Sequence, residues 1–220
     1  ATAAACVFER SDAEVRKLEG LPPRIGVAHG TLPAAVTFVE DRLVYRADVV
    51  AGQKTGFYLD QRANRAAVRT LAAGRETLNA FCYTGGFTLA ALAGGATRVV
   101  SIDSSADAIA LGRENLARNP ALPADRAEWC EADAFAELRK LRDRGAGFDL
   151  AVLDVTEGFV SATFLRNVTA IYGCKNIKFM SAVIGPSNTT GINAQQGYSY
   201  TGYGVTLTAA TPITGNIKHS

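Results

Sequence analysis

The alternation of strand and helix patterns between Thr77 and Asp154 is the feature that most constrains the fold. Short apolar runs typical of buried strands are separated by longer segments in which apolar residues recur at helical spacing. Strands separated by helices in this way pair in parallel and are covered by helices. The sequence therefore predicts an α/β fold built on a mostly parallel sheet. The expected strands are 77–81, 98–103, 128–131 and 148–154, and the expected helices are 87–93, 106–119 and 134–144.

A smaller unit is expected ahead of this sheet. Ser11 and Glu14 have the spacing of a capping box, which predicts a short helix within 10–19. Alternating apolar residues on both sides of the turn at 40–42 predict a hairpin, and residues 60–71 have helical periodicity. Residues 1–50 are therefore expected to form a small α/β segment, followed by the main domain at 51–154.

The composition changes at Asp154. Residues 1–154 carry 19 Lys and Arg with 20 Asp and Glu, whereas residues 155–220 carry 4 and 1. The second segment is instead rich in uncharged polar residues, with 10 Thr and 5 Asn. It is expected to form a tail of small β pieces and loops, with a strand near 205–208 and a helix within 161–171. A chimera, a frameshift or misassigned tail, and an ordinary two-domain protein all remain open.

Charge, cysteine content and hydropathy exclude several classes of protein. The formal net charge of +2 is too small to indicate a polyanionic partner, so any such partner has to meet a local cationic patch. The four cysteines are far apart without a C-x-x-C pair, so neither a disulfide framework nor a metal site is expected. No apolar run reaches the roughly 18 residues of a membrane span, and no secretory signal opens the chain. A cytoplasmic protein is the expectation.

Glycines and acidic residues follow the ends of successive predicted strands. Gly85 and Gly86 follow the first, and Asp103, Asp133 and Asp154 end or follow the others. In open α/β sheets ligands bind at these ends, and an acid there commonly accepts hydrogen bonds from a ribose diol. Paired glycines can also form a plain tight turn, and strand-end acids can cap helices. Their occurrence together favours a nucleoside cofactor.

Two kinds of nucleoside cofactor are compatible with such strand ends. A dinucleotide-binding dehydrogenase is the obvious rival, but the glycine loop at 82–87 is not G-x-G-x-x-G. S-adenosylmethionine has no pyrophosphate, so it needs only a close backbone approach and an acid for its ribose. S-adenosylmethionine is therefore the better match.

Three segments carry a specific resemblance. Residues 52–65 read GQKTGFYLDQRANR, residues 78–87 read LNAFCYTGGF and residues 100–105 read VSIDSS. They resemble the class I, Rossmann-like methyltransferases that form 5-methylcytosine in large-subunit ribosomal RNA. Residues 8–20 are similar to the small α/β domain that precedes the catalytic domain in that family. The resemblance covers about residues 5–154 and leaves the tail unmatched.

The resemblance implies a cofactor site and an RNA-binding face. Asp103 is expected to hold the ribose of S-adenosylmethionine and Asp133 the adenine amine. The full set of expected cofactor residues is Phe81, Tyr83, Gly85, Gly86, Asp103, Ser104, Asp133, Ala134 and Asp154. The residues expected to bind ribosomal RNA, by charge or by stacking, are Lys54, Phe57, Tyr58, Arg62 and Arg65. Alternatively, the arginines of helix 60–71 form a solvent-exposed helix face with no role in binding.

The chain departs from this family where the chemistry is completed. Methylation at C5 of cytosine requires a thiolate that attacks C6, because C5 is a weak nucleophile. The family has Asp-Pro-Pro and a later Ser/Thr-Cys-Ser segment, whereas this chain reads Asp154-Val155-Thr156. Asp154 and Cys174 are the remaining catalytic candidates, with Lys175 able to lower the thiol pKa. Cys82 is expected to serve packing.

Two functions stay open from the sequence alone. The first is an S-adenosylmethionine-dependent methyltransferase of the ribosomal RNA cytosine-5 type whose catalytic half is missing or replaced. The second is a non-enzymatic binding or assembly protein in which the Thr-, Gly- and Asn-rich tail carries the interaction.

Overall fold

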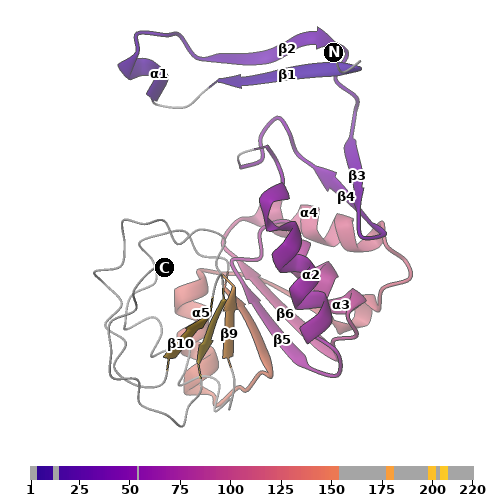
Figure 1. Ribbon diagram of the computed structural model, residues 1–220, viewed down its shortest axis with the longest axis vertical. Coiled ribbons are helices and arrows are strands. Elements are labelled where there is room, and N and C mark those ends of the chain that lie inside the picture. Colours follow the sequence, from indigo (N-terminus) through magenta and orange to yellow (C-terminus); the bar gives the residue numbers. More distant parts are fainter. Residues whose placement is uncertain are drawn as a thin grey trace.

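The computed structural model describes residues 4–11, 15–53 and 55–153, together with three short strands at 177–180, 198–201 and 204–207. Its centre is a parallel sheet of four strands in the order β7-β6-β5-β8 (Figure 1). This sheet confirms the predicted α/β fold. Its strands are β5 (Glu76–Ala80), β6 (Arg98–Asp103), β7 (Ala127–Glu131) and β8 (Leu150–Leu153).

Helices cover both faces of the parallel sheet. One face packs against α5, and the other packs against α2, α3 and α4. These helices are α2 (Arg62–Leu71), α3 (Gly86–Ala93), α4 (Ala106–Ala117) and α5 (Ala134–Asp143), with the 3-10 turns η1 (Leu59–Gln61) and η2 (Ala124–Arg126). Within the described residues, none of the helices is long and apolar enough to cross a membrane.

Alternation along the strands divides the core into two layers. Leu78 and Ala80 of β5 pack with Leu138 and Leu141 of α5. On the other face of the sheet, Val99 of β6 belongs to a cluster that includes residues of α2, α3 and α4. Strands buried on both faces read as nearly continuous apolar runs, which is why the sequence located them well.

The order of the strands creates a switch point at the end of β5. The chain proceeds outward from β5 to β6 and β7, then returns across β5 to form β8 on its other side. The connection that follows β5 leads to β6 on one side of it, and the strand on its other side, β8, is reached only later, from β7 through α5. Ligands of open α/β sheets bind at such points. The loop at 81–86 occupies this position.

A two-stranded hairpin packs on the helical layer. Its strands, β3 (Val36–Glu40) and β4 (Leu43–Ala47), are antiparallel, as the sequence predicted. Asp41 and Arg42 join them with φ values of 49° and 70°, the signature of a type I′ turn. The Asn119 side chain, just beyond α4, accepts the Val44 N–H at 2.8 Å and donates to the Val44 carbonyl at 2.8 Å. The outer edge of β4 is thereby paired with an amide instead of another strand.

The first residues form a second hairpin that the sequence did not reveal. Strand β1 (Cys6–Ser11) pairs with β2 (Arg24–Gly30), and the short α1 (Val15–Leu18) lies between them. Ser11 ends β1, and its hydroxyl donates to the Glu9 carboxylate at 2.8 Å. The short helix predicted within 10–19 is present as α1, whereas the contacts of the predicted capping box involve residues 12–14, which lie outside the described residues. Figure 1 shows this hairpin apart from the parallel sheet, and Arg10 bridges to the Gly52 carbonyl.

The described part of the tail is an antiparallel sheet. Its strands, in the order β10-β11-β9, are β9 (Ile177–Met180), β10 (Tyr198–Thr201) and β11 (Gly204–Leu207). Strand β11 agrees with the strand predicted near 205–208. The helix predicted within 161–171 lies outside the described residues.

A buried ion pair joins the β3–β4 hairpin to α2. The Arg65 guanidinium meets both carboxylate oxygens of Glu40, with Nε to Oε1 at 2.6 Å and Nη2 to Oε2 at 2.8 Å. Its Nη1 donates to the Tyr58 carbonyl at 2.8 Å, and the group lies 4.5 Å from the centroid of the Phe57 ring. The Arg65 and Glu40 side chains are 4% and 7% exposed. Removing one of them therefore leaves the other as a buried charge without a counter-charge.

We expect Arg65→Ala to lower the free energy of unfolding by about 3–5 kcal/mol, because Glu40 is left buried without a counter-charge. The matched control is Arg62→Ala on the same helix, whose side chain is 66% exposed in its pair with Asp41. That change should cost less than about 1 kcal/mol. Urea denaturation measures both, and equal effects would show that the buried pair has no special role.

Candidate cofactor site

The loop that follows β5 has an unusual backbone. Phe81, Tyr83 and Gly85 have φ values of 61°, 46° and 79°. The left-handed region costs a non-glycine residue roughly 1–2 kcal/mol, so the surrounding structure must hold this conformation. The Cys82 N–H donates to the Ile102 carbonyl at 3.0 Å, and the Gly85 N–H donates to the Cys82 carbonyl at 2.9 Å. The loop is thus fixed to the end of β6.

Asp103 completes the attachment from the end of β6. Its Oδ2 accepts the Tyr83 N–H at 2.8 Å, and its Oδ1 accepts the Ser105 N–H at 2.9 Å. An ionised carboxylate offers about four acceptor positions, so one position remains on each oxygen. The half-buried carboxylate can therefore receive two further hydroxyl protons, as a ribose diol would supply.

The third strand end lies beside the second. The Ala132 N–H donates to the Asp103 backbone carbonyl at 2.9 Å, which places Asp133 directly next to the end of β6. Asp133 caps α5, since its Oδ1 accepts the Ala136 N–H at 2.7 Å. This is the structural role that the sequence left open. Asp133 remains exposed to solvent while its carboxyl caps α5.

Two further cofactor candidates flank these acids. Ser104 is exposed between Asp103 and α4. Ala134 is buried, and its methyl group packs in the core with Leu138. Any direct contact of Ala134 with a cofactor must therefore come from its backbone.

The paired glycines make room for protein side chains. A Cβ on Gly85 would lie 2.6 Å from Cη2 of Trp129, and a Cβ on Gly112 would lie 2.6 Å from Cζ3 of the same indole. A Cβ on Gly86 would lie 3.2 Å from Arg65 Cδ and 3.3 Å from Phe57 Cζ. From the sequence, both glycines are expected to allow close approach of a ligand. In the structure, the space that a side chain at each position would need is occupied by other side chains of the protein.

A buried polar chain supports the loop from below. The Asn79 amide donates to Thr88 Oγ1 at 2.9 Å, and Thr88 Oγ1 lies 2.7 Å from Ser101 Oγ. These residues belong to β5, α3 and β6, so the chain ties the start of α3 to both strands beneath it. No pattern in the sequence predicts that these three side chains meet.

An aromatic pair lies at the junction of the loop and α5. The rings of Phe81 and Phe135 are 5.4 Å apart between centroids and meet edge to face at 66°. Phe135 was not among the expected site residues, because a single aromatic residue in a helix predicts a side chain packed in the hydrophobic core. Its position two residues after Asp133 was the available signal.

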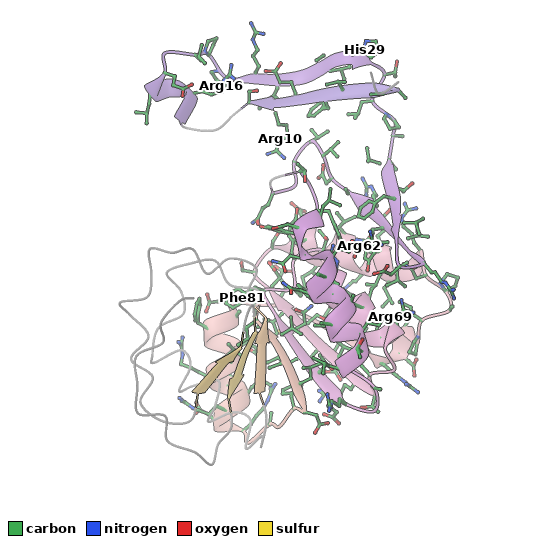
Figure 2. The ribbon with its side chains drawn as sticks, in the orientation of Figure 1. Arg10, Arg16, His29, Arg62, Arg69 and Phe81 are labelled. Carbon is green, nitrogen blue, oxygen red and sulfur yellow. The ribbon has the colours of Figure 1, made fainter. Side chains whose placement is uncertain are left out.

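The structure separates the expected RNA-binding residues into two groups. Arg65 and Phe57 are 3% and 4% exposed, and Arg65 is occupied by Glu40 and by Tyr58. They do not present a charge or a stacking face to solvent, which differs from the expectation. Arg62, labelled on α2 in Figure 2, is exposed and pairs with Asp41 of the hairpin turn. Tyr58 is half-buried. Lys54, Asp154 and Cys174 lie outside the described residues.

Tyr83 joins the loop to the segment that precedes α2. Its hydroxyl accepts the Gln53 N–H at 2.9 Å, and its ring lies 5.4 Å from that of Tyr58 in an edge-to-face arrangement. Tyr58 in turn donates to the Gln53 side-chain carbonyl at 2.9 Å. Burial raises the pKa of Tyr83, so the hydroxyl stays protonated at neutral pH. Gln53 and Tyr58 are thereby held against the loop.

Cys82 is unsuited to nucleophilic chemistry. Its side chain is 3% exposed. Burial raises the pKa of the Cys82 thiol, and the negative charge of Asp103 raises it further. A thiol must ionise to act as a nucleophile. This agrees with the packing role expected from the sequence.

Comparison with known proteins identifies the fold and its cofactor. Residues 29–177 match the model of a family described as S-adenosylmethionine-dependent methyltransferase. The chain belongs to this family. S-adenosylmethionine is the cofactor of the family. The match extends past Asp154, where the resemblance was expected to end.

Curated relatives of this chain allow a more specific comparison. A ribosomal RNA large subunit methyltransferase I from Photobacterium profundum is 45% identical over 179 residues, which is 81% of this chain and 44% of that protein. The protein of the same name from Shewanella frigidimarina is 48% identical over 149 residues, which is 67% of this chain and 37% of that protein. The chain thus spans less than half the length of these relatives.

The methyltransferase fold is also found among solved structures. A SAM-dependent methyltransferase from Agrobacterium tumefaciens superposes with a TM-score of 0.66 at 20% identity, covering 84% of this chain and 62% of that one. At this level of identity the similarity establishes the architecture.

We expect Gly85→Ala to destabilise the methyltransferase domain by about 1–3 kcal/mol more than Gly145→Ala, because the new methyl group must displace Trp129. Gly145 is the matched control, since its φ is also positive, at 70°, and no atom lies within 4 Å of its Cβ position. It therefore reports the backbone strain alone. Urea denaturation followed by the fluorescence of Trp129, the one tryptophan in the sequence, measures both. Equal losses would refute the role assigned to the indole.

Proposed function

We propose that this chain binds S-adenosylmethionine at the carboxyl ends of β5, β6 and β7 and belongs to an enzyme that forms 5-methylcytosine in large-subunit ribosomal RNA. The observation that carries the proposal is the Asp103 carboxylate, which holds the loop at the switch point and keeps acceptor capacity on both oxygens. The names of the relatives from Photobacterium and Shewanella support the RNA substrate. Such an enzyme works in the cytoplasm with the ribosomal subunits.

Each part of the cofactor has a partner in this arrangement. Asp103 accepts the ribose hydroxyls, with Ser104 beside it. Asp133 accepts the adenine amine through the part of its carboxyl that does not cap α5, while the Phe81 and Phe135 rings offer an apolar surface to the base. The amino-acid end meets the backbone of Tyr83, Gly85 and Gly86 and, beyond the described residues, Asp154.

The RNA is proposed to approach from the side of α2. Arg62 supplies an exposed positive charge there, and Lys54 follows in the sequence after Gln53, whose N–H is bonded to Tyr83. Tyr58 offers an aromatic ring to an extruded base. Arg65 and Phe57 support this face from within.

The cysteine chemistry has no assigned residue in the described part of the chain. Cys82 is buried with a raised pKa, and Cys174 lies in a context unlike the family's cysteine segment. We therefore propose that the 220 residues bind the cofactor but transfer its methyl group to RNA very slowly or not at all.

The second candidate is a binding or assembly role carried by the tail. The antiparallel sheet of β9, β10 and β11 favours it, since among the described strands this sheet is not hydrogen-bonded to the parallel sheet, although β9 lies against β8. A cofactor-binding measurement distinguishes the two candidates, because the assembly role requires no nucleoside.

We expect the chain to bind S-adenosylhomocysteine, and we expect Asp103→Asn to weaken this binding by about 10- to 100-fold, because hydrogen bonds to the charged carboxylate are lost. The control is Asp107→Asn in the first turn of α4, which keeps the same helix and leaves Asp103 intact. Isothermal titration calorimetry gives each dissociation constant. Absence of binding by the folded wild-type protein would favour the assembly role.

We expect transfer of tritium from methyl-labelled S-adenosylmethionine to large-subunit ribosomal RNA to be at background level, since Cys82, the cysteine of the cofactor loop, is buried and its thiol pKa is raised. The comparison is a full-length relative assayed on the same RNA. Methyl transfer above background that disappears in Cys174→Ser would assign the nucleophile to Cys174 and contradict the prediction.

A further inference from the structure

The end of α4 and the residues after it carry two buried asparagines one helical turn apart. Asn115 is fully buried and Asn119 is 7% exposed. Both side chains reach the edge strand β4. A buried amide is tolerated when its donors and acceptor are hydrogen-bonded, so its partners reveal what it holds in place.

The two asparagines differ in what they connect. Asn119 bonds to Val44 of β4 and to the backbone carbonyl of Asn115. Asn115 accepts the Arg46 N–H at 2.7 Å through Oδ1 and donates through Nδ2 to the Thr84 carbonyl at 3.1 Å. Only the Asn115 amide therefore bridges the β3–β4 hairpin to the loop at the switch point.

The position of Thr84 makes this contact consequential. Thr84 lies between Tyr83 and Gly85, both of which have positive φ values. The orientation of the carbonyl that joins Thr84 to Gly85 sets the direction of the following backbone, where the proposed cofactor contacts lie. The Asn115 amide of α4 fixes that orientation by its hydrogen bond to the Thr84 carbonyl. Thr84 itself is only 2% exposed.

The same helix supports the loop at a second point. Gly112, one turn before Asn115, leaves space for the indole of Trp129, which also fills the space beside Gly85. The loop therefore rests on α4 through one hydrogen bond and through one shared aromatic side chain.

We propose that Asn115 is a positioning residue for the cofactor loop and that it couples the state of this loop to the backbone of β4 at Arg46. The inference rests on the proposed cofactor site and adds to it a residue that does not touch the cofactor. Binding at the loop orders the Thr84 carbonyl, which tightens the hydrogen bond from Asn115 and, through the same amide, the bond to Arg46. Such coupling is reciprocal.

The mutational test compares Asn115→Asp with Asn119→Asp. Each substitution keeps the acceptor that serves β4 and removes the amide donors, but only the first faces the Thr84 carbonyl with an oxygen. We expect S-adenosylhomocysteine to bind Asn115→Asp about tenfold more weakly than wild type, and to bind Asn119→Asp within about twofold of wild type. Calorimetry is performed well below the melting temperature of each variant. A general loss of stability would move both variants alike.

A second measurement uses the wild-type protein and does not depend on whether a variant folds. Amide hydrogen exchange is followed by NMR with and without S-adenosylhomocysteine. We expect exchange of the Arg46 amide to slow on binding, while the Val44 amide, which is bonded to Asn119, changes little. Both amides lie on the same edge of β4, so the comparison controls for general rigidification.

The outcomes separate this inference from the function on which it rests. Equal affinities of Asn115→Asp and wild type, or equal responses of the Arg46 and Val44 amides, would overturn the coupling while leaving the cofactor site intact. Absence of binding by the wild-type protein would overturn the proposed function and the coupling together.

Discussion

The hydrogen bond from the Tyr83 N–H to the Asp103 carboxylate is the interaction on which the site depends. It crosses from the loop after β5 to the end of β6 and holds a backbone that local energetics disfavour at two non-glycine positions. Without this hydrogen bond, the loop would lose its attachment to β6 at the switch point of the sheet. The same carboxylate is the group proposed to hold the ribose, so the loop and the cofactor share one anchor.

This arrangement explains why the fold follows from the sequence more readily than the site. The strands β5, β6 and β8 are buried on both faces, so their apolar runs and the helical spacing between them identify the sheet directly. The strand-end acids follow from the same pattern. Their joint position needed one further fact, the order β7-β6-β5-β8, which only long-range pairing determines.

Other features depended on contacts that have no local signature. Arg65 has the helical spacing of an exposed residue, and only the arrival of Glu40 from β3 turns it into a buried ion pair. Gly85 and Gly86 were predicted to allow close approach of a ligand, whereas the side chains that require glycine there come from Trp129 of β7 and from residues 57–65. The β1–β2 hairpin was missed because exposed Val7, Ile25 and Val27 give its strands no clear alternation of buried and exposed positions.

The amide of Asn119 has a consequence beyond the packing of α4. An unpaired edge strand offers a row of N–H and C=O groups to strands of other molecules and is a common starting point for aggregation. By accepting and donating at Val44, this side chain imitates a neighbouring strand and occupies that template. A buried amide at Asn119 thus leaves the backbone of Val44 unable to pair with a strand of another molecule.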